Sequence, residues 1–123
     1  EASQRLEKEG ISAGVVNARF VKPLDRELIG NLARRVKRIV TVEENVLEGG
    51  FGSAVLEFLS NLNIEGLKMI RIGLPDCFIE QGTQDYLRKR YGLDADGIES
   101  VIKSLLKRDS GIRELKGTMN QAR

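Results

Sequence analysis

The feature that most constrains the fold is an apolar segment that brings acidic residues to a glycine-rich turn. The segment VTVEEN (residues 40–45) leads into GGFGSAV (residues 49–55). A short run of β-branched residues that ends in polar ones is typical of a buried strand, and glycines before an apolar periodic run are typical of a turn that opens a helix. The sequence therefore predicts a strand, a loop and a helix in succession.

The same order of strand and helix recurs along the chain. We expect strands at residues 11–16, 39–42 and 67–72, because each segment is short and apolar and has polar or glycine neighbours. Apolar residues at helical spacing predict helices over residues 25–36 and 51–62, between these strands. Since helical connections join parallel strands, the sequence predicts βαβ units with right-handed crossovers.

Residues that start and stop helices predict further elements. Three more helices are expected, over residues 2–9, over residues 83–90, and from Asp94 or Asp96 to residue 106. Asp25 and Thr83 are the expected N-caps of their helices, because their side-chain oxygens can accept from free backbone N–H groups. Gly10 is expected to close the first helix in the left-handed conformation.

Together these elements predict an α/β domain of three layers, in which helices flank a mostly parallel sheet. A chain of 123 residues can bury one core, and we expect the domain to span residues 1–108. Because the chain begins within a helix and the predicted sheet has only three strands, we expect the domain to lack its first strand. Residues 109–123 are basic and carry no apolar stripe, so we expect a flexible tail there.

The residue types that are missing exclude several kinds of chemistry. Histidine is absent, and Cys77 is the only cysteine. The chain can therefore assemble neither a Ser-His-Asp triad nor a Cys-His pair, and it cannot form a Cys/His zinc site. A single cysteine also cannot form an internal disulfide. We interpret Cys77 as a small, partly buried apolar residue.

Composition and charge argue against a membrane or nucleic-acid partner. Hydrophobic residues make up 41% of the chain and charged residues 31%, and its apolar runs are only a few residues long. A membrane-spanning helix would need about 20 apolar residues. The formal net charge is +2, and the basic tail contains no aromatic residue that could stack on a base. We expect a cytoplasmic protein that binds neither membrane nor nucleic acid.

Glu43 and Glu44 lie where open α/β sheets bind ligands, at the carboxyl end of a predicted strand. Successive strand residues point to opposite faces of a sheet, so the two carboxylates cannot act together on one bond. A glutamate at a strand end also often caps the next loop. We favour this local structural role over a role in acid-base catalysis.

The glycine turn, residues 49–52, has two interpretations. Glycines allow a close approach of an anion to the backbone at a helix N-terminus. Arg19 and Lys22 could likewise hold an anion, although the residues that follow them look like an ordinary helix start. However, the spacing matches neither the P-loop nor the dinucleotide-binding fingerprint. A tight turn that brings a helix close to the sheet explains the same glycines, and we favour this interpretation.

Three blocks of the sequence resemble the C-terminal domain of the 1-deoxy-D-xylulose-5-phosphate synthase family. The blocks are VNARFVKPLD (residues 16–25), TVEEN with GGFGSAV (residues 41–45 and 49–55) and GLPDCFIEQG (residues 73–82), in that order. The first and third blocks are specific to the synthase, whereas the second occurs more widely in transketolase-like enzymes. Cys77 departs from the charged residue that we would expect in the third block. The resemblance covers residues 1–106.

The resemblance implies a three-domain parent enzyme that condenses pyruvate with glyceraldehyde 3-phosphate and releases carbon dioxide, using thiamine diphosphate and magnesium. In that family the cofactor, substrates and catalytic histidines belong to the first two domains, so we expect no catalytic, cofactor-binding or metal residue here. The third domain also usually opens with a strand before its first helix.

The resemblance implies an architectural role, in which this domain packs against the other two domains and helps to build a homodimer. Six residues are the expected contacts with a neighbouring domain or an anion: Glu43, Glu44, Asn45, Gly49, Gly50 and Gly52. Two alternatives stay open. One is the C-terminal domain of a transketolase or of a pyruvate dehydrogenase beta subunit, and the other is a free-standing module that binds an anion or nucleotide at the glycine turn.

Overall fold

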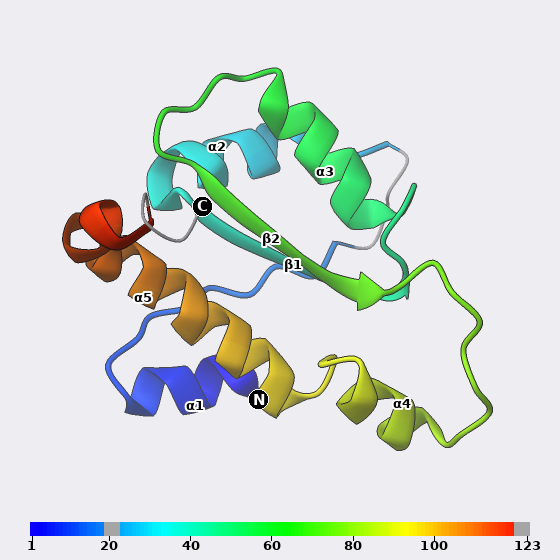
Figure 1. Cartoon of the computed structure of the whole chain (residues 1–123). Helices are drawn as coiled ribbons and strands as arrows, with labels where there is room; N and C mark the ends of the chain where they lie inside the picture. The colour runs from blue at the N-terminus through cyan, green and yellow to red at the C-terminus, as the bar shows by residue number, and fades with distance from the viewer. Residues whose placement is uncertain (19–22, 120–123) are drawn as a thin grey trace.

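The computed structural model describes residues 1–18 and 23–119, with the side chains of residues 1–18 and 23–107. In this part of the chain the elements follow in the order α1 (Ala2–Lys8), α2 (Arg26–Val36), β1 (Arg38–Val46), α3 (Phe51–Ser60), β2 (Lys68–Leu74), α4 (Gln84–Arg90) and α5 (Ala95–Met119). β1 and β2 pair in parallel, as the sequence predicts (Figure 1).

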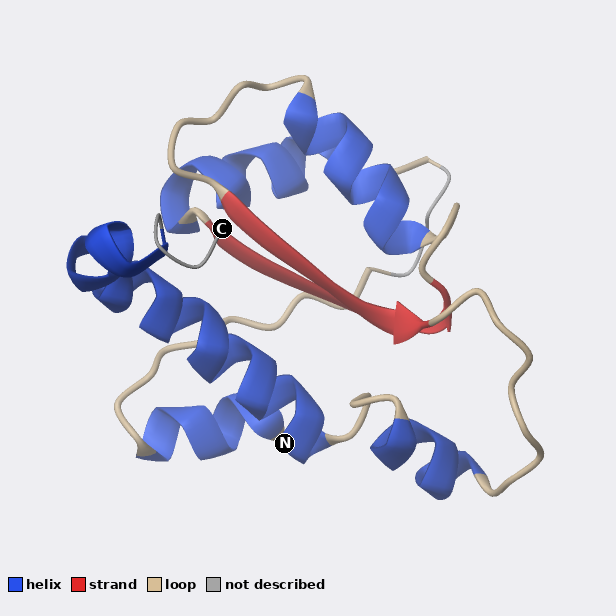
Figure 2. Cartoon of the chain, in the orientation of Figure 1, coloured by secondary structure: helices blue, strands red, loops and turns tan. Residues whose placement is uncertain are grey.

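The elements form three layers around this sheet. Helices α2 and α3 cover one face, and α1 and α5 lie on the other, as the separation of helices and strands in Figure 2 shows. α4 stands beyond the carboxyl end of β2, at the end of a long loop. The predicted α/β architecture with a parallel sheet between helices is confirmed.

The main core lies between the sheet and helices α2 and α3. Ala33 from α2 and Val55 and Leu59 from α3 are buried there, and partly buried side chains of both strands pack around them. Arg26 lies 5.5 Å from the centre of the Phe58 ring, so a cation–π contact adds to the packing of α2 on α3. The amphipathic stripes of these helices therefore meet the sheet as their spacing predicts.

The predicted helix boundaries are confirmed at their caps. Asp25 accepts a hydrogen bond from the backbone N–H of Leu28, and Thr83 accepts one from the N–H of Tyr86. Gly10 has φ +79° and follows the C-cap of α1, which is the left-handed position that glycine adopts without steric cost. Local capping chemistry thus sets where these helices begin and end.

The predicted strand at residues 11–16 is wrong. This segment has no strand assignment, and the sheet of the described residues consists of β1 and β2 alone. Val15 is 79% exposed, and the carbonyl of Ala13 accepts from the Ser3 hydroxyl of α1 at 2.6 Å rather than from a neighbouring strand. A strand is stable only when its N–H and C=O groups pair in a ladder, and no described strand offers that ladder here.

The structure differs from the sequence prediction in two further places. Helix α5 continues to Met119, where we expected an irregular tail from residue 109. Residues 112–116, IRELK, are mostly good helix formers, and a helix can continue without an apolar stripe. Flexibility of residues 109–123 stays a prediction. Cys77 is exposed, not partly buried, because it lies in the loop that leaves β2.

The helices in the described ranges include none with the length and apolar character that crossing a membrane requires.

Candidate functional site

The most organised polar region lies where β1 ends and α3 begins. β1 and β2 pair residue by residue from Arg38 opposite Lys68 to Val42 opposite Ile72, and the next pair is Val46 with Leu74. The irregularity between Val42 and Val46 falls on the acidic segment. A bulge of this kind bends a strand and re-aims its side chains.

Glu43 caps helix α3. Its two carboxylate oxygens accept from the backbone N–H of Phe51 at 2.8 Å and from the N–H of Gly52 at 2.9 Å. These donors lie in the first turn of the helix, where no carbonyl of the helix itself can pair with them. The negative charge also lies at the positive end of the helix dipole. The predicted local structural role of Glu43 is therefore confirmed.

The glycines around Glu43 leave room for its side chain. A Cβ atom on Gly52 would lie 2.7 Å from Thr41 Oγ1 and 2.9 Å from Glu43 Oε1. A Cβ atom on Gly73 in β2 would lie 3.1 Å from Glu43 Cγ, and one on Gly50 would overlap the Glu43 carboxylate. The glycine turn thus brings α3 close to the sheet, as the favoured interpretation predicts.

The same glycine turn does not offer an open anion site. The N–H groups of Phe51 and Gly52, which would bind an incoming phosphate, already pair with the Glu43 carboxylate. A bound anion would have to displace that carboxylate and would meet its negative charge. The arrangement can fix a helix on a sheet, because its polar groups within the described residues already pair with one another.

Arg71 is a member of this region that sequence reasoning missed. Its guanidinium Nη1 donates to Ser53 Oγ at 2.8 Å and to the carbonyl of Leu47 at 3.2 Å, and Ser53 Oγ donates to that carbonyl at 2.5 Å. The signal was present, because Arg71 is a charged residue within the apolar strand KMIRIGL (residues 68–74). It ties β2 to the loop before α3.

Glu44 makes its contacts on a different element. Its carboxylate forms an ion pair with Arg88 of α4, and Gln84 donates to its other oxygen at 3.3 Å. The hydrogen bond from Arg88 holds the pKa of Glu44 below its ordinary value. Glu43 and Glu44 therefore contact different helices, which agrees with the expectation that they cannot act on one bond.

The other predicted site residues are placed as follows. Asn45 is exposed, and its side-chain oxygen accepts from the N–H of Val46 at 2.9 Å. Gly49 has φ +71° and open space around it, so its part in the turn is conformational. Arg19 and Lys22 lie outside the described residues. Contact of the six predicted residues with a neighbouring domain stays a prediction.

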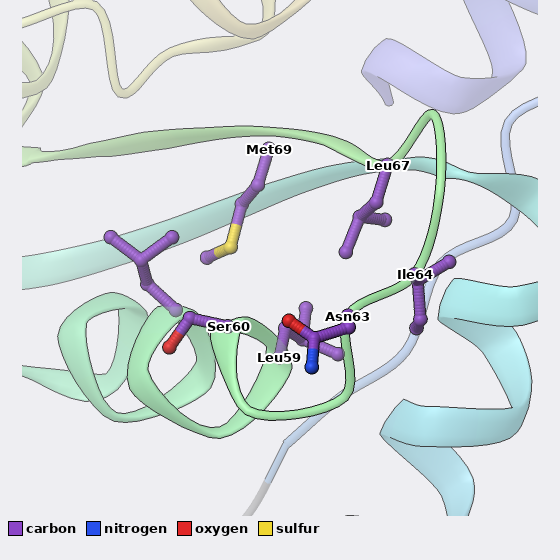
Figure 3. A pocket seen from close by; sticks show the side chains of 7 residues that line it. Leu59, Ser60, Asn63, Ile64, Leu67 and Met69 are labelled. Atoms are coloured by element: carbon purple, nitrogen blue, oxygen red, sulfur yellow. The ribbon is translucent and has the colours of Figure 1, made fainter.

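Two of the hollows on the described surface are well enough formed to consider, and neither has the residues of a catalytic site. The first, of about 270 Å³, lies between α3 and the start of β2, where Leu67 and Met69 point towards Leu59 and Ser60 (Figure 3). Its lining also includes Leu56, Asn63 and Ile64, so it carries no titratable side chain. The second, of about 330 Å³, lies beside α1 at Ser3, Glu7 and residues 10–13.

The part of the chain that the structure describes also contains no candidate metal site. No three acidic, cysteine or histidine side chains converge there at a spacing that could hold an ion. The polar contacts at the carboxyl end of the sheet instead join protein groups to one another. The region is therefore a structural junction between β1, β2, α3 and α4.

Substituting glutamine for Glu43 is expected to lower the free energy of unfolding by about 1–2 kcal/mol, because one charged acceptor at the α3 N-terminus becomes an amide donor. Urea unfolding of the chain measures this change. Glu48→Gln is the matched control, since Glu48 is an exposed glutamate in the loop between β1 and α3. Equal stability of the two variants would contradict the capping role.

The ion pair between Glu44 and Arg88 is expected to stabilise the attachment of α4 only above acidic pH. A carboxyl group with a lowered folded-state pKa contributes stability above its unfolded pKa, and this contribution disappears as the pH falls through the folded value. In Arg88→Gln the pKa of Glu44 should rise towards its ordinary value, as measured by NMR titration of the carboxyl carbon. Lys89→Gln should leave it unchanged, and an unchanged titration in Arg88→Gln would contradict the pairing.

Comparisons with known proteins identify relatives over most of the chain. The model of the family "Transketolase, C-terminal domain" matches residues 1–98. The chain is 55% identical over 107 residues to 1-deoxy-D-xylulose-5-phosphate synthase 1 of Geobacter metallireducens, which covers 87% of this chain and 17% of the relative. It is 51% identical over 108 residues to the synthase of Aquifex aeolicus, again covering 17% of that protein.

A solved structure supports the fold. The structure "Split gene transketolase, inactive beta4 tetramer" superposes with a TM-score of 0.78 and 38% identity, covering 86% of this chain and 34% of that one. The resemblance inferred from the three sequence blocks is thus confirmed. This chain spans 17% of the length of the synthases that it matches.

Proposed function

Because the chain belongs to the family of transketolase C-terminal domains, we propose that it is the C-terminal domain of a 1-deoxy-D-xylulose-5-phosphate synthase. The whole protein would condense pyruvate with glyceraldehyde 3-phosphate to 1-deoxy-D-xylulose 5-phosphate and release carbon dioxide. The 55% identity to a named synthase carries this proposal, since the identity to the split-gene transketolase is 38%. This difference also disfavours the transketolase alternative.

The role of this domain within the synthase would be architectural. Thiamine diphosphate and magnesium would supply the carbanion chemistry of the whole enzyme, but the described residues do not fit a site for either. They form no cluster of metal ligands, and the helix N-terminus at the glycine turn is occupied by Glu43. We therefore assign cofactor and substrate binding to other domains and expect no turnover by this chain alone.

The proposed partners are the other two domains of the synthase and a second copy in a homodimer, in the cytoplasm. Glu44 and Asn45 are exposed, so among the six predicted contacts they are the ones with side chains available to a neighbouring domain. Glu43, Gly50 and Gly52 would support such a contact indirectly, by holding α3 in place.

The proposal is tested on the native polypeptide. An antibody raised against this chain would capture it from source cells, and its mass and carbon dioxide release from pyruvate plus glyceraldehyde 3-phosphate would be measured. We expect a mass about five times the 13.7 kDa of this chain, because the 107 aligned residues make up 17% of the relative, and release that depends on thiamine diphosphate. A polypeptide of this chain's own mass, without activity, would favour the free-standing module.

A further inference from the structure

The segment from residue 75 to residue 90, here called the Phe78 arm, extends from the carboxyl end of the sheet. It contains the loop after β2 and helix α4, which has no buried residue (Figure 1). Phe78 in this loop is 96% exposed, and Tyr86 of α4 is 49% exposed. A phenylalanine of this exposure leaves nearly its whole ring in water, so the ring adds almost nothing to the stability of this domain and is available for burial by a partner.

The arm is nevertheless held in a defined shape. The N–H of Cys77 donates to the carbonyl of Pro75 at 2.9 Å, which forms a tight turn directly before Phe78. At the other end, Arg90 lies 2.6 Å from Glu80 in an ion pair, and Arg88 pairs with Glu44 of β1. These contacts fix both ends of the loop, so Phe78 is displayed by a structured segment.

We propose that the Phe78 arm docks onto another domain of the same polypeptide, with Phe78 inserted into an apolar pocket. This inference rests on the proposed function, because it requires a longer protein. The length of the matched relatives supplies such a partner, since this chain spans only 17% of them. Buried aromatic side chains often contribute strongly to the affinity of protein interfaces, and Phe78 is the most exposed aromatic residue of this arm.

The arm itself carries no net charge, because Asp76, Glu80 and Asp85 balance Arg88, Lys89 and Arg90. Arg88 and Arg90 are also paired, with Glu44 and Glu80. Docking of the arm therefore depends on the apolar ring of Phe78, and the cross-linking test distinguishes an upstream domain from a second copy of the chain.

The test uses the full-length protein in its native oligomer. The photo-crosslinking residue benzoylphenylalanine would be placed at Cys77, which is exposed and adjacent to Phe78. Proteins assembled from isotopically light and heavy copies would be irradiated, and the joined peptides identified by mass spectrometry. We expect cross-links from position 77 to an upstream domain of the same isotopic copy. Links between light and heavy copies, or none, would overturn the proposal.

A substitution provides a second readout. Phe78→Ser should raise amide hydrogen exchange of residues 75–83 by about tenfold in the full-length protein, because it removes the anchoring ring. Leu56→Ser, at a half-exposed leucine of α3, is the control and should leave exchange of that loop unchanged. Equal exchange in wild type and Phe78→Ser would overturn the docking proposal.

The two proposals fail in different ways. If the wild-type full-length protein released carbon dioxide but gave no such cross-link, the docking proposal would be overturned and the proposed function would stand. If a long polypeptide gave the expected cross-link but had no synthase activity, the proposed function would be overturned and the docking proposal would stand. A native mass equal to that of this chain would remove both, because no upstream domain would exist.

Discussion

Gly52→Ala is expected to lower the free energy of unfolding by about 2 kcal/mol, although alanine is the better helix former. A Cβ atom at this position would lie 2.7 Å from Thr41 Oγ1 and 2.9 Å from Glu43 Oε1, closer than side chains pack. Overpacking costs about 1–3 kcal/mol, and displacement of the Glu43 cap costs about 1 kcal/mol more. The gain in helix propensity returns at most about 1 kcal/mol.

Gly30→Ala is the matched control, because Gly30 also lies within a helix and is buried. Its Cβ atom would lie 3.3 Å from the flexible end of Arg34 and 3.5 Å from Leu62 Cδ1, so its neighbours can adjust. We expect a change of less than about 1 kcal/mol in urea unfolding. If both variants unfolded at the same denaturant concentration, the close approach of α3 to the sheet would not explain Gly52.

The comparison of these two glycines illustrates what the sequence could predict. Periodicity and caps predicted the helices and the parallel pairing, because these depend on local residue patterns. The glycine turn and the capping role of Glu43 were also predictable, since a strand end beside a helix start leaves few other partners. The close approach of α3 to the sheet at Gly52 was predictable for the same reason, because the strand, the glycine turn and the helix follow one another directly in the sequence.

The failures arose where a structure depends on distant partners. Residues 11–16 have the composition of a strand, but a strand also needs a neighbour to pair with, and composition cannot supply one. Arg71 was missed because its acceptors lie on the loop and helix before it, 18 and 24 positions away in the chain. Likewise, the pairing of Glu44 with Arg88 across 44 positions follows from how α4 folds back to β1.

Leu59→Ala is expected to lower the free energy of unfolding by about 2–5 kcal/mol, more than the other substitutions in α3. Leu59 is 2% exposed and packs with Ala33 and Val55 at the centre of the core between α2, α3 and the sheet. Truncation to alanine would leave a cavity that the surrounding side chains fill only in part, so both transfer energy and packing are lost.

Leu56→Ala separates this packing effect from the loss of a leucine as such. Leu56 lies on the same helix and is 42% exposed, so the two substitutions share the same change in helix propensity but differ in burial. We expect Leu56→Ala to lower the free energy of unfolding by less than about 1 kcal/mol. The slope of this free energy against urea concentration should be the same in both variants. Similar losses would mean that the α3 side of the sheet is not the main core.

A larger loss for Leu59→Ala would show that α3 stabilises the domain through its buried apolar residues. Glu43 then has a different role, because it fixes the N-terminal end of the same helix.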